Sequence, residues 1–82
     1  MIIREFDNLD HEGKLDATWD HGVRIGYRED EEHRIILYQV SSFYIEFYFS
    51  KVKNKLVSIE SFEDTDRLAP YTALINIPSP TG

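Results

Sequence analysis

The strongest pattern of apolar side chains runs through residues 35–50, IILYQVSSFYIEFYFS. Most of these residues are β-branched or aromatic, and such side chains favour strands because they pack well on a pleated surface. A two-residue turn at Ser41 and Ser42 aligns the two halves as a β-hairpin. Its apolar pairs are Val40 with Phe43, Tyr38 with Ile45, and Ile36 with Phe47. Because side chains alternate between the faces of a sheet, all six lie on one face, which we assign to the core.

A further strand is predicted before this hairpin, at residues 23–28 (VRIGYR). Apolar side chains occupy every second position, so Val23, Ile25 and Tyr27 share one face. We interpret the acidic residues 29–32 as a four-residue loop that leads into the hairpin. The resulting pairs are Tyr27 with Arg34, Ile25 with Ile36, and Val23 with Tyr38. In this register the apolar faces of the neighbouring strands agree.

The last predicted strand covers residues 55–62 (KLVSIESF), with Val57 and Ile59 facing the core. A loop precedes it, in which Asn54 suits a positive φ. Sequential strands are usually neighbours in a sheet. We therefore predict an antiparallel β-meander of about four strands.

Residues 10–21 (DHEGKLDATWDH) fit two interpretations. Alternating apolar side chains favour a strand. A helix is favoured by Asp10 as an N-cap and by the i,i+4 spacing of Leu15 and Trp19. Gly22 follows at a position where a helix end often takes left-handed geometry. We predict a helix, packed on the apolar face of the sheet.

The two ends of the chain carry weaker patterns. Residues 1–9 fit a short helix or an edge strand, and the pattern leaves both open. After the last strand we predict a turn at 65–69 and a helix that begins near Pro70, because proline is tolerated in the first turn of a helix. Its inner face is formed by Leu68, Tyr71, Leu74 and Ile75. We expect this helix to pack on the same face as the first, and residues 78–82 to form a flexible tail. The predicted fold class is α+β, with one domain at residues 1–77.

The second face of the central hairpin mixes apolar and polar side chains. With both helices committed to the other face, little of an 82-residue chain is left to cover it. Contiguous exposed apolar patches mark interfaces, and a symmetric dimer is the commonest way to bury one. We therefore predict a homodimer or another protein partner on this face. The candidate interface residues are Ile35, Leu37, Tyr44, Glu46 and Tyr48.

The composition of the chain limits the classes of partner and the cellular compartment that we expect. The chain has nine basic and fifteen acidic residues and a net charge of −6, which disfavours nucleic acid and anionic membranes as partners. It has no cysteine, so disulfides and thiolate metal sites are excluded. The N-terminal residues MIIREFDN carry charges where a signal peptide needs an apolar stretch. No apolar run approaches the ~20 residues of a membrane span. We expect a cytoplasmic protein.

Candidate chemistry is sparse in this sequence. His11 and His21 each follow an aspartate, but adjacent helical residues point about 100° apart and cannot chelate one metal together. We interpret the acidic residues around them as a solvated face, and we predict no metal and no cofactor. Glu46 is the one acid inside an aromatic run, where a dry pocket would suit acid–base catalysis. We favour the alternative in which Glu46 pairs with Arg24, Arg28 or a lysine, because charged strand residues mostly lie at the surface. We predict no catalytic residue.

Three short segments stand out beside these patterns. They are Trp19-Asp20-His21-Gly22, Phe43-Tyr44-Ile45-Glu46, and Ser61-Phe62 with Thr65, Leu68, Pro70 and Tyr71. Together they resemble a family of small bacterial proteins of uncharacterised function, over about residues 15–75. The resemblance implies a helix before the Trp19 segment. It implies no activity, cofactor or site, because none of the segments is a catalytic motif.

Three functions follow from these observations. The first is a non-enzymatic protein-interaction module that associates with itself through the second face of the sheet. The second is an acidic inhibitor, antitoxin or immunity-type protein that masks a basic partner. The third is a small enzyme or ligand binder that uses Glu46 and its neighbouring tyrosines. We favour the first, because the sequence contains no catalytic or nucleotide-binding motif.

Overall fold

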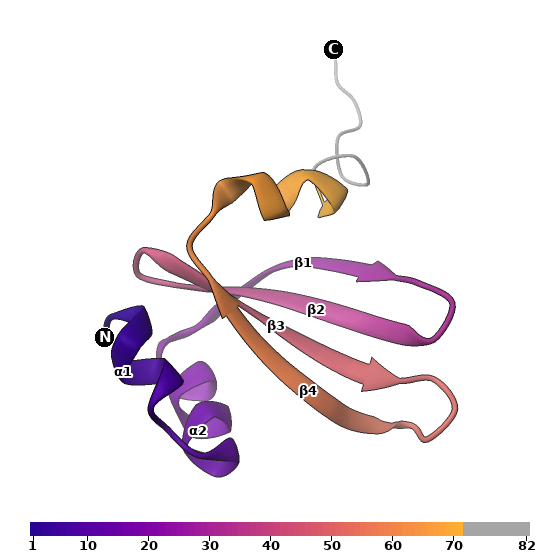
Figure 1. Ribbon diagram of the computed structural model, residues 1–82, viewed down its shortest axis with the longest axis horizontal. Coiled ribbons are helices and arrows are strands. Elements are labelled where there is room, and N and C mark those ends of the chain that lie inside the picture. Colours follow the sequence, from indigo (N-terminus) through magenta and orange to yellow (C-terminus); the bar gives the residue numbers. More distant parts are fainter. Residues whose placement is uncertain (72–82) are drawn as a thin grey trace.

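The computed structural model describes residues 1–71 and has an α+β fold, as predicted (Figure 1). Its elements are α1 (Ile3–Asp7), α2 (His11–His21), β1 (Val23–Glu29), β2 (His33–Val40), β3 (Phe43–Ser50), β4 (Lys55–Phe62) and the 3₁₀ helix η1 (Thr65–Leu68). The strands form one antiparallel sheet in the order β1-β2-β3-β4, which confirms the meander. Residues 72–82 lie outside the described part of the chain, and with them the predicted tail and the predicted inward positions of Leu74 and Ile75.

The central hairpin has the predicted register. β2 and β3 pair Val40 with Phe43 and continue without interruption to His33 and Ser50. Ser41 takes a φ of 52°, as a tight two-residue hairpin turn requires. The local pattern of apolar residues and the length of the turn therefore determine this part of the fold together.

Residues 10–21 form a helix, and the alternative strand is wrong. The Asp10 side chain accepts a hydrogen bond of 2.8 Å from the Gly13 backbone N–H, which caps the start of α2. The left-handed geometry expected at Gly22 is also wrong, because Gly22 has a φ of −89°. Glycine is needed there for space instead, since a Cβ would lie 2.7 Å from the carbonyl oxygen of Thr18. Residues 1–9, left open by the sequence, contain helix α1.

The predicted register of β1 is wrong because the loop between β1 and β2 covers only residues 30–32, whereas the prediction placed four residues, 29–32, in it. The Asp30 carboxylate accepts hydrogen bonds from the backbone N–H groups of Glu32 and His33, so pairing already begins at Glu29. The pairs are Glu29 with Arg34, Arg28 with Ile35, Tyr27 with Ile36, Gly26 with Leu37, Arg24 with Tyr38, and Val23 with Gln39. A β-bulge between Arg24 and Gly26 then reverses the faces of the residues before it. Val23, Ile25 and Tyr27 are all exposed instead of buried in the core, although Tyr27, which follows the bulge, pairs with Ile36 on the predicted face.

A second bulge changes the faces in β4. Tyr48 pairs with Ser58, whereas Phe49 pairs with Leu56, so the register shifts at Val57. Leu56 takes an inward position, and Val57 is 42% exposed instead of facing the core. The inward position predicted for Ile59 is confirmed, because it packs against the main core. The loop prediction for Asn54 is also confirmed, by its φ of 55°.

The two helical regions cover opposite faces of the sheet, which corrects the prediction that both pack on one face (Figure 1). Phe6 of α1 and Ala17 of α2 pack on the predicted core face, which we call the helix-bearing face. Its buried sheet residues are Val40, Phe43, Ile45 and Phe47. Residues 65–71, which we call the C-terminal strap, place Leu68 and Tyr71 on the other face, the strap-bearing face.

The direction of the strap has a local cause at the end of β4. Phe62 ends this strand and packs with Ile35 and Leu37 on the strap-bearing face. The carboxylate of Asp64 then accepts a 2.8 Å hydrogen bond from the Asp66 backbone N–H and so caps η1. The chain therefore turns across the strap-bearing face instead of returning to the helices.

Candidate functional site

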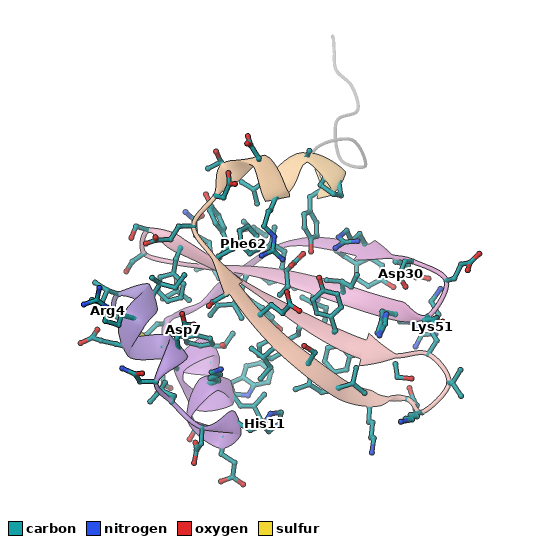
Figure 2. All side chains as sticks on the ribbon, viewed as in Figure 1. Arg4, Asp7, His11, Asp30, Lys51 and Phe62 are labelled. Atoms are coloured by element: carbon teal, nitrogen blue, oxygen red, sulfur yellow. The ribbon has the colours of Figure 1, made fainter. Side chains whose placement is uncertain are left out.

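The predicted interface residues come together on one face, but the chain itself covers them. Ile35 is 0% exposed, Leu37 is 2% exposed and Glu46 is 1% exposed, while Tyr44 and Tyr48 are half-buried. The side chains of the strap fill the space above them, beside the labelled Phe62 in Figure 2. The prediction of an open interface on this face is therefore wrong, because it assumed that the C-terminal helical residues pack elsewhere.

Glu46 is the centre of a hydrogen-bond network beneath the strap. Its Oε2 accepts hydrogen bonds from the Tyr71 hydroxyl at 2.6 Å and from Nη2 of Arg28 at 3.4 Å. Its Oε1 accepts hydrogen bonds from Nη2 of Arg67 at 2.9 Å and from the Tyr48 hydroxyl at 3.1 Å. The predicted pairing of Glu46 with Arg28 is thus present, but the carboxylate is buried and not on an open sheet surface.

The tyrosines of this network act as hydrogen-bond donors. Burial raises the pKa of Tyr71, and its hydrogen bond to the Glu46 carboxylate raises it further. Burial and the charge of Glu46 likewise raise the pKa of Tyr48. Both hydroxyls therefore keep their protons at neutral pH. Because donors occupy both oxygens of a solvent-excluded carboxylate, we interpret the Glu46 network as the attachment of the strap to the sheet.

An apolar groove on the helix-bearing face is the feature that sequence reasoning missed. It has a volume of about 670 Å³ and lies between α2 and the sheet. Its apolar walls include Leu15, Trp19, Ile36, Tyr38, Phe49 and Leu56. Trp19 is 70% exposed, although large aromatic side chains usually bury most of their surface. We call this feature the Trp19 groove.

The groove exists because the helices are too short to cover the whole sheet. α2 has 11 residues and α1 has five, and both lie over one end of the strands (Figure 1). Ile36, Phe49 and Leu56, toward the other end, stay half-buried. The i,i+4 pair of Leu15 and Trp19 was the available signal in the sequence. The partial exposure of this pair depends on how long α2 is relative to the strands. The local pattern of apolar residues does not contain that information.

The histidines and acidic residues of α2 form no site within residues 1–71. His11 and His21 occupy the two ends of the helix, about 15 Å apart at the usual rise per residue. Glu12, Asp16 and Asp20 are exposed along it. In the described range, no three histidine, cysteine, aspartate or glutamate side chains gather as metal ligands. No helix in that range is long and apolar enough to cross a membrane.

Comparisons with known proteins identify no relative from which a function could be transferred. No family model, no curated protein and no solved structure matches the chain. The resemblance to an uncharacterised bacterial family stays a prediction. The function must therefore be argued from the geometry of the Trp19 groove and the Glu46 network.

Proposed function

We propose that this protein is a small non-enzymatic interaction module that associates with a second copy of itself through the Trp19 groove. The observation that carries the proposal is the position of Trp19. It is a large aromatic side chain, 70% exposed, at the rim of an apolar groove on the same face of the molecule. Exposed contiguous apolar surface of this kind is typical of interaction sites.

A second copy suits this surface because the projecting side chain and the groove lie side by side. A two-fold axis requires a self-complementary surface, in which each copy gives and receives the same contact. Trp19 of one copy would enter the groove of the other, where half-buried Phe49 and Leu56 offer apolar contacts. Tryptophan is among the residues that most often dominate the binding energy of an interface.

A small apolar ligand is the second candidate, and the volume of the groove favours it. Small-molecule sites typically enclose about 300–1,000 Å³ and are mostly lined by apolar and aromatic side chains. The Trp19 groove, at about 670 Å³, falls in this range. The idea of an acidic inhibitor is supported by the net charge of −6 alone. The enzyme hypothesis based on Glu46 loses its support, because the carboxylate is 1% exposed and its oxygens are occupied.

Sedimentation velocity over a concentration series tests the proposal. We expect the wild type to form a dimer as concentration rises, and Trp19→Glu to stay a monomer with an unchanged circular dichroism spectrum. The fold should survive because substitutions of exposed residues usually change stability by about 0.5 kcal/mol or less. Val52→Glu is the matched control, since Val52 is 89% exposed in the turn between β3 and β4. This variant carries the same added charge and should associate like the wild type.

Two results would contradict the proposal. A wild type that stays monomeric at high micromolar concentration would exclude self-association as the function of the groove. A Trp19→Glu variant that dimerises as tightly as the wild type would place the interface elsewhere. If the wild type is monomeric but copurifies with an apolar compound that Trp19→Glu lacks, the ligand-binding candidate replaces the interaction module.

A further inference from the structure

Among residues 1–71, the walls of the Trp19 groove contain one charged side chain, that of Arg24. Arg24 is exposed on β1 and pairs across the strands with Tyr38, another groove residue. No carboxylate of residues 1–71 lies within ion-pair distance of its guanidinium. By contrast, Arg28 and Arg67 both bind Glu46. An arginine without a partner at the edge of an apolar groove favours an occupant that brings a negative charge.

The side chains next to Trp19 on α2 supply that charge. Asp16 lies three residues before Trp19, so helical geometry places the two on a shared side of α2. Asp20 follows Trp19 directly. Both are exposed, and neither forms an ion pair within the described residues. Asp20 also lies in the last turn of the helix, where the helix dipole disfavours a carboxylate, so its position gains nothing from the fold.

We propose that Arg24 determines the specificity of self-association by pairing with Asp16 and Asp20 of the second copy. This inference rests on the proposed function. When Trp19 enters the groove of the other copy, the two carboxylates beside it are carried toward that copy's Arg24. The two-fold axis forms the contact twice. The pairing also counters a general repulsion, because each copy carries a net charge of −6.

A charge exchange between two variants tests this pairing. The first variant is Arg24→Glu, and the second combines Asp16→Lys with Asp20→Lys. Like charges that face each other across an interface are strongly unfavourable, so each variant alone should self-associate at least about tenfold more weakly than the wild type. In an equimolar mixture the reversed charges become complementary again. Sedimentation of the mixture should recover an affinity within about threefold of the wild type.

The control is Lys53→Glu, which changes the net charge as much as Arg24→Glu but lies in the exposed turn between β3 and β4. It should self-associate like the wild type. All substituted residues are exposed, and circular dichroism verifies folding. If Arg24→Glu does not fold, Arg24→Gln replaces it and should show a smaller loss. Its mixture with the lysine variant keeps one of the two Arg24 contacts, so it should associate more tightly than either variant alone but more weakly than the wild type.

The outcomes separate this inference from the proposed function. One outcome overturns the Arg24 pairing alone. In this outcome the wild type dimerises through Trp19, but the mixture associates as weakly as each of the two variants. The same holds if Arg24→Glu and Lys53→Glu associate equally well. A wild type that never dimerises overturns the proposed function and this inference together. Recovery in the mixture supports the inference when the lysine variant alone associates weakly, because general repulsion alone would make that variant, with its smaller net negative charge, associate more tightly than the wild type.

Discussion

The Tyr71 hydroxyl donates a 2.6 Å hydrogen bond to Oε2 of Glu46, which lies 25 residues earlier on the inner strand β3. This contact attaches the C-terminal strap to the sheet and explains why the strap-bearing face is not an open interface. A buried carboxylate is expensive to desolvate unless it is well paired. Here four donors from four different residues satisfy it.

Removal of the Tyr71 hydroxyl should weaken this attachment. Tyr71→Phe leaves an oxygen of the buried carboxylate with only the 3.4 Å contact from Arg28, and we expect unfolding to become easier by about 1–3 kcal/mol. Tyr44→Phe is the control, because Tyr44 lies on the same face and stacks on Phe62. Its hydroxyl has no hydrogen bond among residues 1–71. Urea denaturation measures both variants, and equal losses would contradict the role of Tyr71.

The raised pKa values of Tyr71 and Tyr48 predict a loss of stability at alkaline pH. The ordinary pKa of tyrosine is 10.0, and both groups lie above it in the folded state. The folded protein therefore binds protons more tightly than the unfolded chain. The stabilisation is complete below the unfolded pKa and is lost as pH rises through the folded values. Urea midpoints from about pH 8 to about pH 12 should fall above about pH 10. In this pH range the midpoints of Tyr71→Phe should fall less steeply than those of the wild type. Parallel curves for the two proteins would contradict a raised pKa of Tyr71 in the folded state.

The bulge in β4 leads to a paired prediction about the core. Phe47 is 3% exposed at the centre of the helix-bearing face, and Phe47→Ala should cost about 3–5 kcal/mol. In a domain this small, such a loss should leave the variant largely unfolded. Val57→Ala should change stability by about 0.5 kcal/mol or less, because the bulge turns Val57 outward. Thermal unfolding measures the stability of both variants. A large loss of stability in Val57→Ala would contradict the bulge and indicate that Val57 faces the core.

How far the sequence predicts this fold depends on how local the causes are. The hairpin from Ile35 to Ser50 was predictable because its alternation and two-residue turn lie within one segment. The register of β1 was not, because it depends on the Asp30 side chain in the loop and on the bulge at Ile25. Bulges leave no clear mark in a pattern of apolar and polar residues.

The candidate sites show the same limit over longer distances. Glu46 was recognisable as an unusual acid within an aromatic run, and its partner Arg28 was among the alternatives named from the sequence. Its burial depends on Tyr71 and Arg67, which follow it by 25 and 21 residues. The groove depends on how much of the sheet α2 covers. Trp19 could be placed on a helix, but its exposure follows only from the assembled fold.

Gly22 provides a test of the end of α2. Its φ of −89° is accessible to alanine, so backbone conformation alone predicts little effect. The contact predicts the opposite, because a Cβ would lie 2.7 Å from the Thr18 carbonyl oxygen, which belongs to the backbone and cannot rotate away. We expect Gly22→Ala to destabilise the fold by about 1–3 kcal/mol, as overpacking does. A variant as stable as the wild type in urea would contradict this account of the helix end.

Trp19 fluorescence tests the central claim most directly, because Trp19 is the only tryptophan in the chain. Selective excitation of tryptophan therefore reports the rim of the groove alone. We predict that the emission maximum of the wild type moves to shorter wavelength as protein concentration rises. The midpoint of this change should match the midpoint of dimerisation measured by sedimentation. Val52→Glu should behave in the same way. An emission maximum that keeps its solvent-exposed position while sedimentation shows dimers would contradict burial of Trp19 between two copies.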